Sequence, residues 1–489
     1  MKIKDFLFNN LGIKQTVFKN TLWLSLSEAI TGLLGFALVI FAVRILGVTE
    51  YGKFTFAISF VSMMAIFSDL GITNMATREF SRRNENRTKF SEFLSLDLVL
   101  SFFSLFLIIL GSFFITPNPQ IQKIIWVLSF FVLIISFFGI FYSFFRGMQK
   151  MEYESSVRIV QAVIFFTTTL FALYYFRSAV GFAYGYFLSS IVIMILFLPF
   201  FHFFFHPIKL AWNKNVFKLL KISWPLSIGF TSTWIYINIA SINLGYFNLI
   251  SENGWYGASA RMAIIILLPA TLVVRSFYPL LSNFYINSKE KFIKAWNYLM
   301  MSMIFFTVPM AIGGITLASK IIDFFYGSAF APSIIIFQFL IMVVVITLIG
   351  YPYNVALVIS DNQKKNFFII LAGVLAHIIL NIILIPLYGL NGLIISIVIS
   401  SIVAFLLTVI VLKYFTNVKI PIFNMALLKD TIMVCCSGLL MFFVIRLPLV
   451  YNLNVLYIIV IGALVYSSCL LLLLKTFTNL LNEKPKIRI

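Results

Sequence analysis

The sequence is poor in charged residues, and acidic residues are the scarcest of them. Only 11% of its 489 residues are charged, with 36 Lys and Arg against 16 Asp and Glu. Soluble domains carry roughly 25% charged residues, so this composition excludes the ordinary soluble class. A nucleic-acid-binding protein would gather its positive charge on a soluble surface, whereas here the charges stand singly or in short groups between apolar runs. We therefore expect no nucleic-acid partner.

Motifs of metal binding and nucleotide hydrolysis are also lacking. The three cysteines, Cys435, Cys436 and Cys469, lie in apolar stretches without the spacing of a metal site. No GxxxxGK[ST] phosphate-binding loop occurs, which argues against a self-contained ATP-driven pump. All predicted loops are short, which argues against an enzyme with a folded extracytoplasmic domain. We therefore expect a protein that is not an enzyme and has no cofactor, with H⁺ or Na⁺ as the candidate coupling ion.

Hydrophobic residues make up 61% of the chain and gather in long runs. Each run spans about twenty residues, enough to cross a hydrocarbon core of about 30 Å. Breaks with turn chemistry, such as Thr116-Pro117-Asn118-Pro119, separate the runs. This pattern predicts an all-α polytopic membrane protein of about fourteen transmembrane helices. We expect them at residues 20–43, 55–79, 91–115, 123–145, 156–176, 182–205, 219–245, 256–281, 294–317, 333–359, 367–387, 391–415, 429–449 and 453–475.

The positions of Lys and Arg support this number of helices. With residues 1–19 as an amphipathic cytoplasmic lead-in, 28 of the 36 Lys and Arg fall at cytoplasmic helix ends, seven fall at outer ends, and Arg275 falls inside a helix. A missing or extra helix would scramble this alternation, because loops rich in Lys and Arg stay in the cytoplasm. We therefore expect both termini in the cytoplasm, with a basic tail at residues 476–489.

Short matches between the two halves indicate an internal repeat. The segment Leu46-Gly47…Tyr51-Gly52 recurs as Leu244-Gly245…Tyr256-Gly257, and Gln149-Lys150 recurs as Gln363-Lys364. The repeat predicts two six-helix lobes, residues 20–205 and 219–415, joined by a cytoplasmic linker at 206–218 and followed by two additional helices at 429–475. Because six is even, both lobes enter the membrane in the same orientation. Parallel repeats around a central cavity are typical of transporters.

A few polar residues inside the predicted helices are candidates for lining that cavity. Polar side chains at such depth are costly unless they face a cavity or a partner. Helix 219–245 carries a polar stripe that includes Trp234 and Asn238, while Glu28 and Asp69 lie within the first and second helices. The alternative is that these stripes of small and polar residues serve helix packing.

The basic residues and one histidine inside or near the helices allow two interpretations each. We hypothesise that Asp69 pairs with Arg275 across the cavity, although each could instead be neutralised within its own lobe. Arg44 and Arg261 lie near outer helix ends, where they either face the cavity or snorkel to the interface. His377 is either a hydrogen-bonded packing residue or a proton site.

The N-terminal part carries a set of motifs that resembles a known family. The segments Arg44-Ile45-Leu46-Gly47, Glu50-Tyr51-Gly52, Asp69-Leu70-Gly71-Ile72 and Thr77-Arg78-Glu79 are similar to the signature of the polysaccharide-repeat-unit flippases. These proteins belong to the multidrug/oligosaccharidyl-lipid/polysaccharide exporter superfamily.

The resemblance implies two six-helix bundles around a V-shaped cavity, in the bacterial cytoplasmic (inner) membrane. It implies that an undecaprenyl-diphosphate-linked oligosaccharide crosses to the outer leaflet for O-antigen or capsule synthesis. Arg44, Arg78, Arg261 and Arg275 would then offer cations to the diphosphate. Membrane lipids are further partners, and a polymerase and a chain-length regulator of the same pathway are candidate ones. We expect a monomer.

Other members of the superfamily provide alternatives. A multidrug or cation antiporter would use Glu28 and Asp69 for the coupling ion or the cationic drug. The lipid II flippases share the fold but carry more cavity arginines than this sequence offers. A membrane enzyme of glycan assembly is a third alternative, which the short loops disfavour.

Overall fold

The computed structural model describes residues 12–82, 87–205, 208–211, 219–220, 223, 234–416 and 425–482. Most of the expected linker at 206–218, and the second half of the basic tail at 476–489, lie outside these residues. Every regular element in the described part is a helix. Twelve of the helical stretches are long and apolar enough to cross a membrane. The expected all-α, multi-pass class is therefore confirmed.

The twelve candidate spans are consistent with the expected number of about fourteen transmembrane helices. Two regions of the chain account for the difference. The first candidate span, Gln15–Arg82, is 68 residues long and covers both helices expected at 20–43 and 55–79. The helix expected at 219–245 is described mainly over its last part, residues 234–246. In chain order, the labelled helices are α2 (Ile13–Met64), α3 (Ile66–Asp69), α4 (Ile72–Arg82), α5 (Arg87–Ile115), α6 (Pro119–Gly147), α7 (Met151–Phe176), α8 (Ala179–Phe204), α10 (Ile250–Asn287), α11 (Lys289–Thr316), α12 (Ala318–Tyr326), the 3₁₀ turn η1 (Ser328–Phe330), α13 (Ser333–Ile359), α14 (Gln363–Tyr388), α15 (Leu390–Phe415), α16 (Met425–Arg446), α17 (Pro448–Tyr451) and α18 (Val455–Asn482).

The first two membrane-crossing helices of the structure differ in part from those expected at 20–43 and 55–79. In place of the loop expected after residue 43, two helices meet at a kink at Gly47, whose φ is 72° and ψ −178°, and the label α2 covers both of them. Glycine has no Cβ and adopts this left-handed conformation at little cost. The continuous helix expected at 55–79 is wrong, because the chain ends α2 at Met64 and resumes as α3 and α4.

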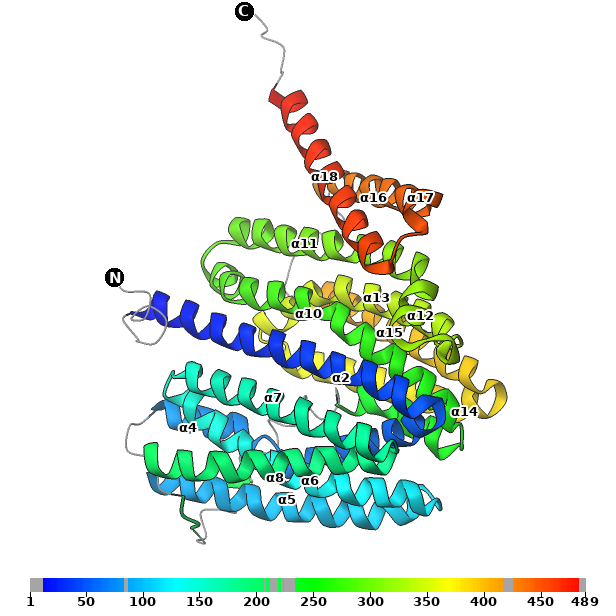
Figure 1. Ribbon diagram of the computed structural model, residues 1–489. Helices are drawn as coiled ribbons and strands as arrows, with labels where there is room; N and C mark the ends of the chain where they lie inside the picture. Colours follow the sequence, from blue (N-terminus) through cyan, green and yellow to red (C-terminus); the bar gives the residue numbers. More distant parts are fainter. Residues whose placement is uncertain are drawn as a thin grey trace, which may run out of the picture. The chain divides into compact units, whose positions relative to one another are not determined.

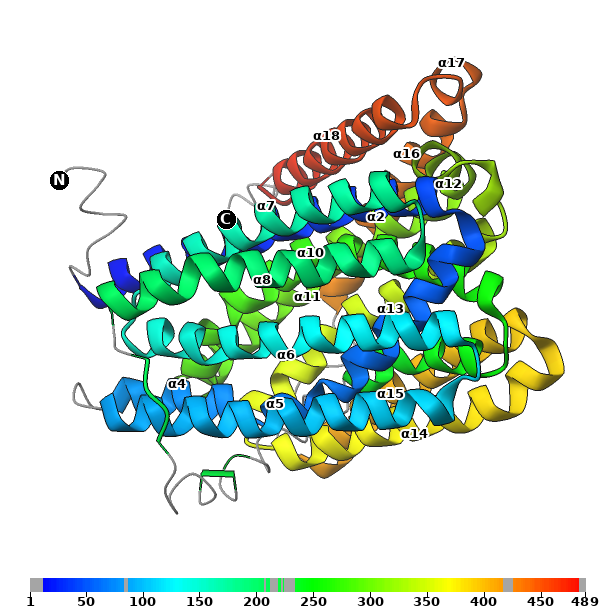
Figure 2. The same cartoon turned by 60° about the horizontal axis from the view of Figure 1, so that its bottom comes forward.

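The chain forms two compact units. The first contains Met1–Ala258 and Ile378–Leu393, and the second contains Ser259–His377 and Ile394–Ile489. In the first unit α2 packs against α7, and α6 packs against both α5 and α8, an arrangement that can be followed in Figure 1. Figure 2 shows α5 and α6 side by side along most of their length. In the second unit α11 packs against α13 and α16, and α16 packs against α18.

Phenylalanine dominates the core of the first unit. Phe90, Phe141 and Phe201 are almost fully buried and belong to α5, α6 and α8. The Phe141 and Phe201 rings meet edge to face with their centroids 4.5 Å apart. Such aromatic pairs add stabilisation beyond the area they bury. They fix the helices that carry the polar residues described below.

Glycines allow α2 and the start of α10 to approach closely within the first unit. A Cβ added at Gly52 would lie 1.9 Å from the carbonyl oxygen of Ile250, and one added at Gly254 would lie 2.2 Å from that of Val48. The amide of Asn253 donates to the Gly52 carbonyl oxygen at 3.1 Å. Small residues are typical of helix contacts in membranes because the backbones can touch. Gly52 and Tyr256-Gly257 belong to the two copies of the repeated motif, so these copies lie near each other.

Candidate functional site

A break in the second membrane crossing creates the most polar feature of the first unit. After α3 ends at Asp69, Leu70 has φ 38° and Gly71 has φ 81°, and α4 begins at Ile72. A left-handed leucine is strained, because its Cβ approaches the following carbonyl oxygen. Residues of this kind cluster at functional sites, where the surrounding structure holds them. The break therefore marks a candidate site at membrane depth.

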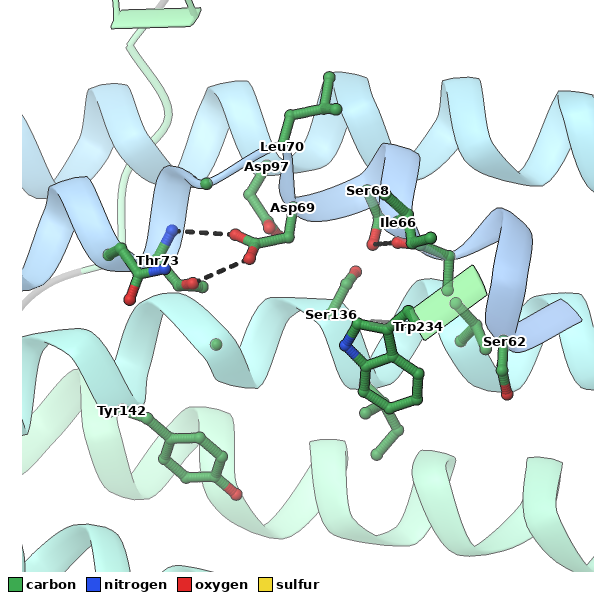
Figure 3. A pocket seen from close by; sticks show the side chains of 16 residues that line it. Ser62, Ile66, Ser68, Asp69, Leu70, Thr73, Asp97, Ser136, Tyr142 and Trp234 are labelled. Atoms are coloured by element: carbon green, nitrogen blue, oxygen red, sulfur yellow. Dashed lines mark hydrogen bonds between the residues drawn. The ribbon is translucent and has the colours of Figure 1, made fainter. Parts of the chain in front are cut away.

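Asp69 stabilises the helix that restarts after the break. Its Oδ1 accepts a hydrogen bond from the Thr73 backbone N–H at 2.9 Å, and its Oδ2 accepts one from the Thr73 hydroxyl at 3.0 Å. The first N–H groups of a helix lack partners within the helix, so a carboxylate at this place acts as a cap. Figure 3 shows both bonds and the Asp69 carboxylate at the cavity.

The break opens into a cavity of about 450 Å³. Residues of α2 to α6 and Trp234 form its wall, so the cavity lies within the first unit. Polar groups come from every side. The polar lining residues are Ser62, Ser68, Asp69, Thr73, Asn74, Asp97, Ser136, Tyr142 and Trp234.

Asp97 is the second carboxylate of this cavity. It projects from α5, is 1% exposed, and its Oδ2 has no hydrogen-bond partner among the described residues. The Asp97 and Asp69 carboxyl groups are near enough for their charges to interact, and Figure 3 shows the Asp97 carboxyl directed toward Asp69. None of the sixteen lining residues is Lys, Arg or His. Among the described residues, the cavity wall thus gathers negative charge and contributes no positive one.

A charged network lies on the other side of Tyr142. The Arg158 guanidinium stacks on the Tyr142 ring, 4.4 Å from its centroid. Arg158 Nε and Arg146 Nη2 both contact Glu154 Oε1, at 2.9 and 2.6 Å, and the Glu154 side chain is fully buried. The Tyr142 hydroxyl donates to Gln161 Oε1. A carboxylate held by two guanidinium groups is well compensated, so this network fixes Tyr142 at the cavity wall.

The structure brings together two of the residues that the sequence suggested as cavity-lining. Asp69 and Trp234 line the same cavity, and Trp234 is 51% exposed. Asn238 is not among the lining residues of this cavity, and its amide donates to the Trp234 carbonyl oxygen one turn earlier. Glu28 is half-buried on α2, and Arg44 and Arg78 are exposed on α2 and α4. The part of the expected polar stripe at 224–233 lies outside the described residues.

The other expected residues belong to the second unit. Arg261 and Arg275 are exposed on α10, and Arg275 interacts electrostatically with Tyr351. His377 is 1% exposed on α14. Asp69 makes its two bonds within its own unit, and its pairing with Arg275 stays a prediction.

Sequence reasoning missed Asp97 and the network around Tyr142. A signal for Asp97 was present, because an acid six residues into an apolar run is as costly as the Asp69 carboxylate. The network gave no such signal. Arg146 lies at the end of α6, and Glu154 and Arg158 lie in the first two turns of α7. Charges are expected near such helix ends in any membrane protein.

Comparisons with solved structures define the class of protein. The fold is similar to the lipid II flippase MurJ in an inward closed conformation, with 18% identity, a TM-score of 0.69, and coverage of 94% of this chain and 99% of that one. An inward-facing multidrug resistance MATE transporter of the MOP superfamily has 16% identity, a TM-score of 0.63, and coverage of 78% and 94%. A MOP superfamily transporter from Pyrococcus furiosus has 16% identity, a TM-score of 0.54, and coverage of 84% and 98%. The chain is a multi-pass membrane protein with the MurJ/MATE-like transporter fold.

The family follows from the sequence model that matches this chain. The model of the polysaccharide biosynthesis proteins matches residues 17–285, more than half of the chain. The protein therefore belongs to this family, as the N-terminal motifs predicted. No curated protein matches the chain significantly.

Proposed function

We propose that the protein translocates undecaprenyl-diphosphate-linked oligosaccharide repeat units across the bacterial cytoplasmic membrane. The substrate enters from the cytoplasmic leaflet, leaves to the outer leaflet, and serves the synthesis of O-antigen or capsule. The match to the polysaccharide biosynthesis family over residues 17–285 carries this proposal. The transporter fold supports it, because the structural neighbours are flippases and exporters.

The chemistry of such a substrate requires both cations and hydrogen-bonding groups. A diphosphate carries about two negative charges, which are costly in a low-dielectric space unless fixed cations and donors meet them. The candidate cations are Arg44, Arg78, Arg261 and Arg275, whose side chains are all exposed. Trp234 presents an exposed indole at the polar cavity and suits the apolar face of a sugar ring. The polyprenyl chain stays in the lipid.

Gene deletion followed by analysis of glycans tests the proposal. We expect single lipid-linked repeat units to accumulate on the inner leaflet and surface polysaccharide to disappear. Single units that reach the surface without polymerising would instead indicate a polymerase and contradict the proposal.

Arg275→Ala tests the anionic part of the substrate. We expect this variant to lose polysaccharide export at normal protein abundance, because a cation at membrane depth is not needed for topology. Arg82→Ala is the matched control. The Arg82 side chain is 65% exposed at a helix end, and its one salt bridge among the described residues, to Glu79, is long at 3.9 Å. Export at the wild-type level in the Arg275 variant would remove this residue from the mechanism.

One observation favours a second candidate function, the export of organic cations. The cavity combines two carboxylates with an indole, and cations bind to both kinds of group. Susceptibility of the deletion strain to cationic drugs separates the two functions. A strain that becomes drug-sensitive and keeps its surface polysaccharide would support the cation exporter.

A further inference from the structure

An apolar groove of about 240 Å³ runs between α7 and α8 of the first unit. Seven of its ten lining residues have hydrocarbon side chains. Ile193 and Phe197 form its floor and are buried as part of the phenylalanine-rich core, whereas Val160 and Leu196 are exposed at its sides. The core therefore fixes the shape of the groove, and its open side suits hydrocarbon chains, which are as apolar as leucine.

The length of the groove matches the depth of one lipid leaflet. On α7 it runs from Tyr153 to Ile164, which is about 16 Å at the rise of an α-helix. One half of a hydrocarbon core of about 30 Å is about 15 Å. Tyr153 lies in the first turn of α7, which begins at Met151, so the groove starts at a helix end. A single acyl chain that descends from a headgroup at this end fits that length, whereas an undecaprenyl chain is far longer.

Positive charge gathers near the end where the groove starts. Lys150 Nζ lies 5.9 Å from the centroid of the Tyr153 ring, so the ammonium group stands beside the first residue of the groove. Arg146 and Arg158 share the carboxylate of Glu154, and both guanidinium side chains are partly exposed. These groups carry three positive charges against one negative charge. Basic clusters between membrane helices bind the headgroups of anionic lipids.

We propose that the groove binds one acyl chain of an anionic phospholipid, with the phosphate of that lipid at the Lys150 end. The hydrocarbon wall contacts the chain, and the basic cluster selects the headgroup by its charge. In the orientation predicted from the Lys and Arg distribution, this lipid belongs to the cytoplasmic leaflet.

One polar residue of the groove links it to the cavity of the first unit. Gln161 lines the groove, and its Oε1 accepts a hydrogen bond from the Tyr142 hydroxyl. Tyr142 in turn lines the polar cavity. An acyl chain in the groove therefore packs against the residue that holds Tyr142. An effect of the lipid on transport rests on the proposed function, whereas the binding itself does not.

Binding of defined phospholipids to the full chain tests the site without any glycan. Purified protein in detergent is titrated with dioleoyl phosphatidylglycerol, which is anionic, or with dioleoyl phosphatidylcholine, which has the same chains and no net charge. A ligand that binds only the folded state raises the melting temperature in a saturable manner. For wild type we expect such a rise with phosphatidylglycerol, at least fivefold weaker binding of phosphatidylcholine, and one phosphatidylglycerol molecule retained in native mass spectrometry.

Val160→Trp tests the apolar part of the site, because the indole fills the groove from a position that is 56% exposed and outside the core. We expect this variant to lose the retained lipid and to melt no lower than lipid-free wild type. Val163→Trp is the matched control, since Val163 is 46% exposed on the same helix and is not a lining residue of the groove. It should bind phosphatidylglycerol as wild type does.

Lys150→Gln tests the headgroup end of the site. We expect it to weaken phosphatidylglycerol binding about fivefold, the loss of one basic residue at a membrane surface, and to leave phosphatidylcholine binding unchanged. Lys123→Gln is the matched control, because Lys123 Nζ lies at a similar distance, 6.0 Å, from the Tyr184 ring. Lys123 is in the first turns of α6, whereas α7 begins just after the other end of that helix.

Three results would overturn the proposal. They are equal affinity for the two phospholipids, phosphatidylglycerol binding that survives unchanged in Val160→Trp or in Lys150→Gln, and displacement of phosphatidylglycerol by a smaller amount of undecaprenyl phosphate, which would assign the groove to a polyprenyl chain. Each would leave the proposed function standing if the deletion strain accumulates lipid-linked units. Conversely, phosphatidylglycerol binding that both variants weaken, alongside normal polysaccharide in the deletion strain, would keep the site and reject the function.

Discussion

At the scale of single residues, buried ion pairs hold the ends of the helices in the first unit. Lys19 Nζ on α2 lies 2.9 Å from Glu152 Oε2 on α7, with side-chain exposures of 0% and 6%. Removing one member of such a pair leaves the other charge buried without its partner. Lys19→Met should therefore lower the free energy of unfolding by about 3–5 kcal/mol. Thermal or denaturant unfolding in detergent measures this loss.

A double variant and an exposed control pair test whether burial of the charges causes this loss of stability. The double variant Lys19→Met with Glu152→Gln removes both charges and should recover most of the loss. Lys294→Met removes a salt bridge of similar length, 2.7 Å, but with exposures of 68% and 78%, and should have no measurable effect. Equal losses for Lys19→Met and Lys294→Met would show that burial does not govern these pairs.

Single residues of the site were predictable where one property of the sequence was enough. Asp69 stood out as an acid inside an apolar run, and Trp234 followed from the polar stripe of its helix. The closeness of Asp69 and Asp97 could not be predicted, because it depends on how α3 packs against α5. The same limit applies to Tyr142, whose place at the cavity wall follows from its contact with Arg158.

At the scale of elements, the break at Leu70 and Gly71 predicts opposite outcomes for two Gly→Ala substitutions. Gly71 has φ 81°, which an alanine reaches only with strain, so Gly71→Ala should destabilise the protein by about 1–2 kcal/mol. Gly35 lies inside α2 with no atom within 4 Å of an added Cβ, so Gly35→Ala should stabilise it by about 0.5–1 kcal/mol. Melting temperatures of the two variants check the signs. Stabilisation by both substitutions would mean that α3 and α4 form one continuous helix.

The close contact between α2 and α10 makes a second prediction at this scale. Gly52→Ala places a methyl group where the Ile250 carbonyl oxygen lies, and neither backbone can yield without separation of the helices. We expect a clear drop in melting temperature. Gly313→Ala, whose added Cβ would lie 4.0 Å from Met441, is the tolerated control. A Gly52→Ala protein as stable as wild type would contradict this packing.

The sequence predicted membrane spans far better than interruptions within them. The expected helix at 333–359 coincides with α13, because long apolar runs between turn residues define both ends. The break after Asp69 has no such signature, since two residues of left-handed backbone leave the hydrophobic pattern intact. The kink at Gly47 shows a related limit: the sequence predicted a loop after residue 43, whereas two helices meet directly at this glycine.

At the scale of the whole molecule, we propose that transport proceeds by alternating access, and that the contact between α2 and the start of α10 in the first unit opens during it. The hydroxyl oxygens of Thr49 and Ser251 lie 3.3 Å apart at this contact. In a background without the native cysteines, Thr49→Cys with Ser251→Cys should form a disulfide, because the two sulfur atoms would replace hydroxyl oxygens that already lie 3.3 Å apart. We expect oxidation to block polysaccharide export and reduction to restore it. Full export by the oxidised, cross-linked protein would show that this contact does not open.

The central claim, that the protein moves a lipid-linked oligosaccharide across a membrane, is tested most directly by reconstitution. Purified protein is placed in liposomes that contain a labelled undecaprenyl-diphosphate oligosaccharide in both leaflets, and a membrane-impermeant reagent modifies the outer-leaflet sugar. We predict that nearly all of the label becomes accessible within minutes in the presence of wild-type protein, and only about half of it in empty liposomes or with Arg275→Ala. Accessibility that stays at half with stable, correctly folded wild-type protein would contradict the claim.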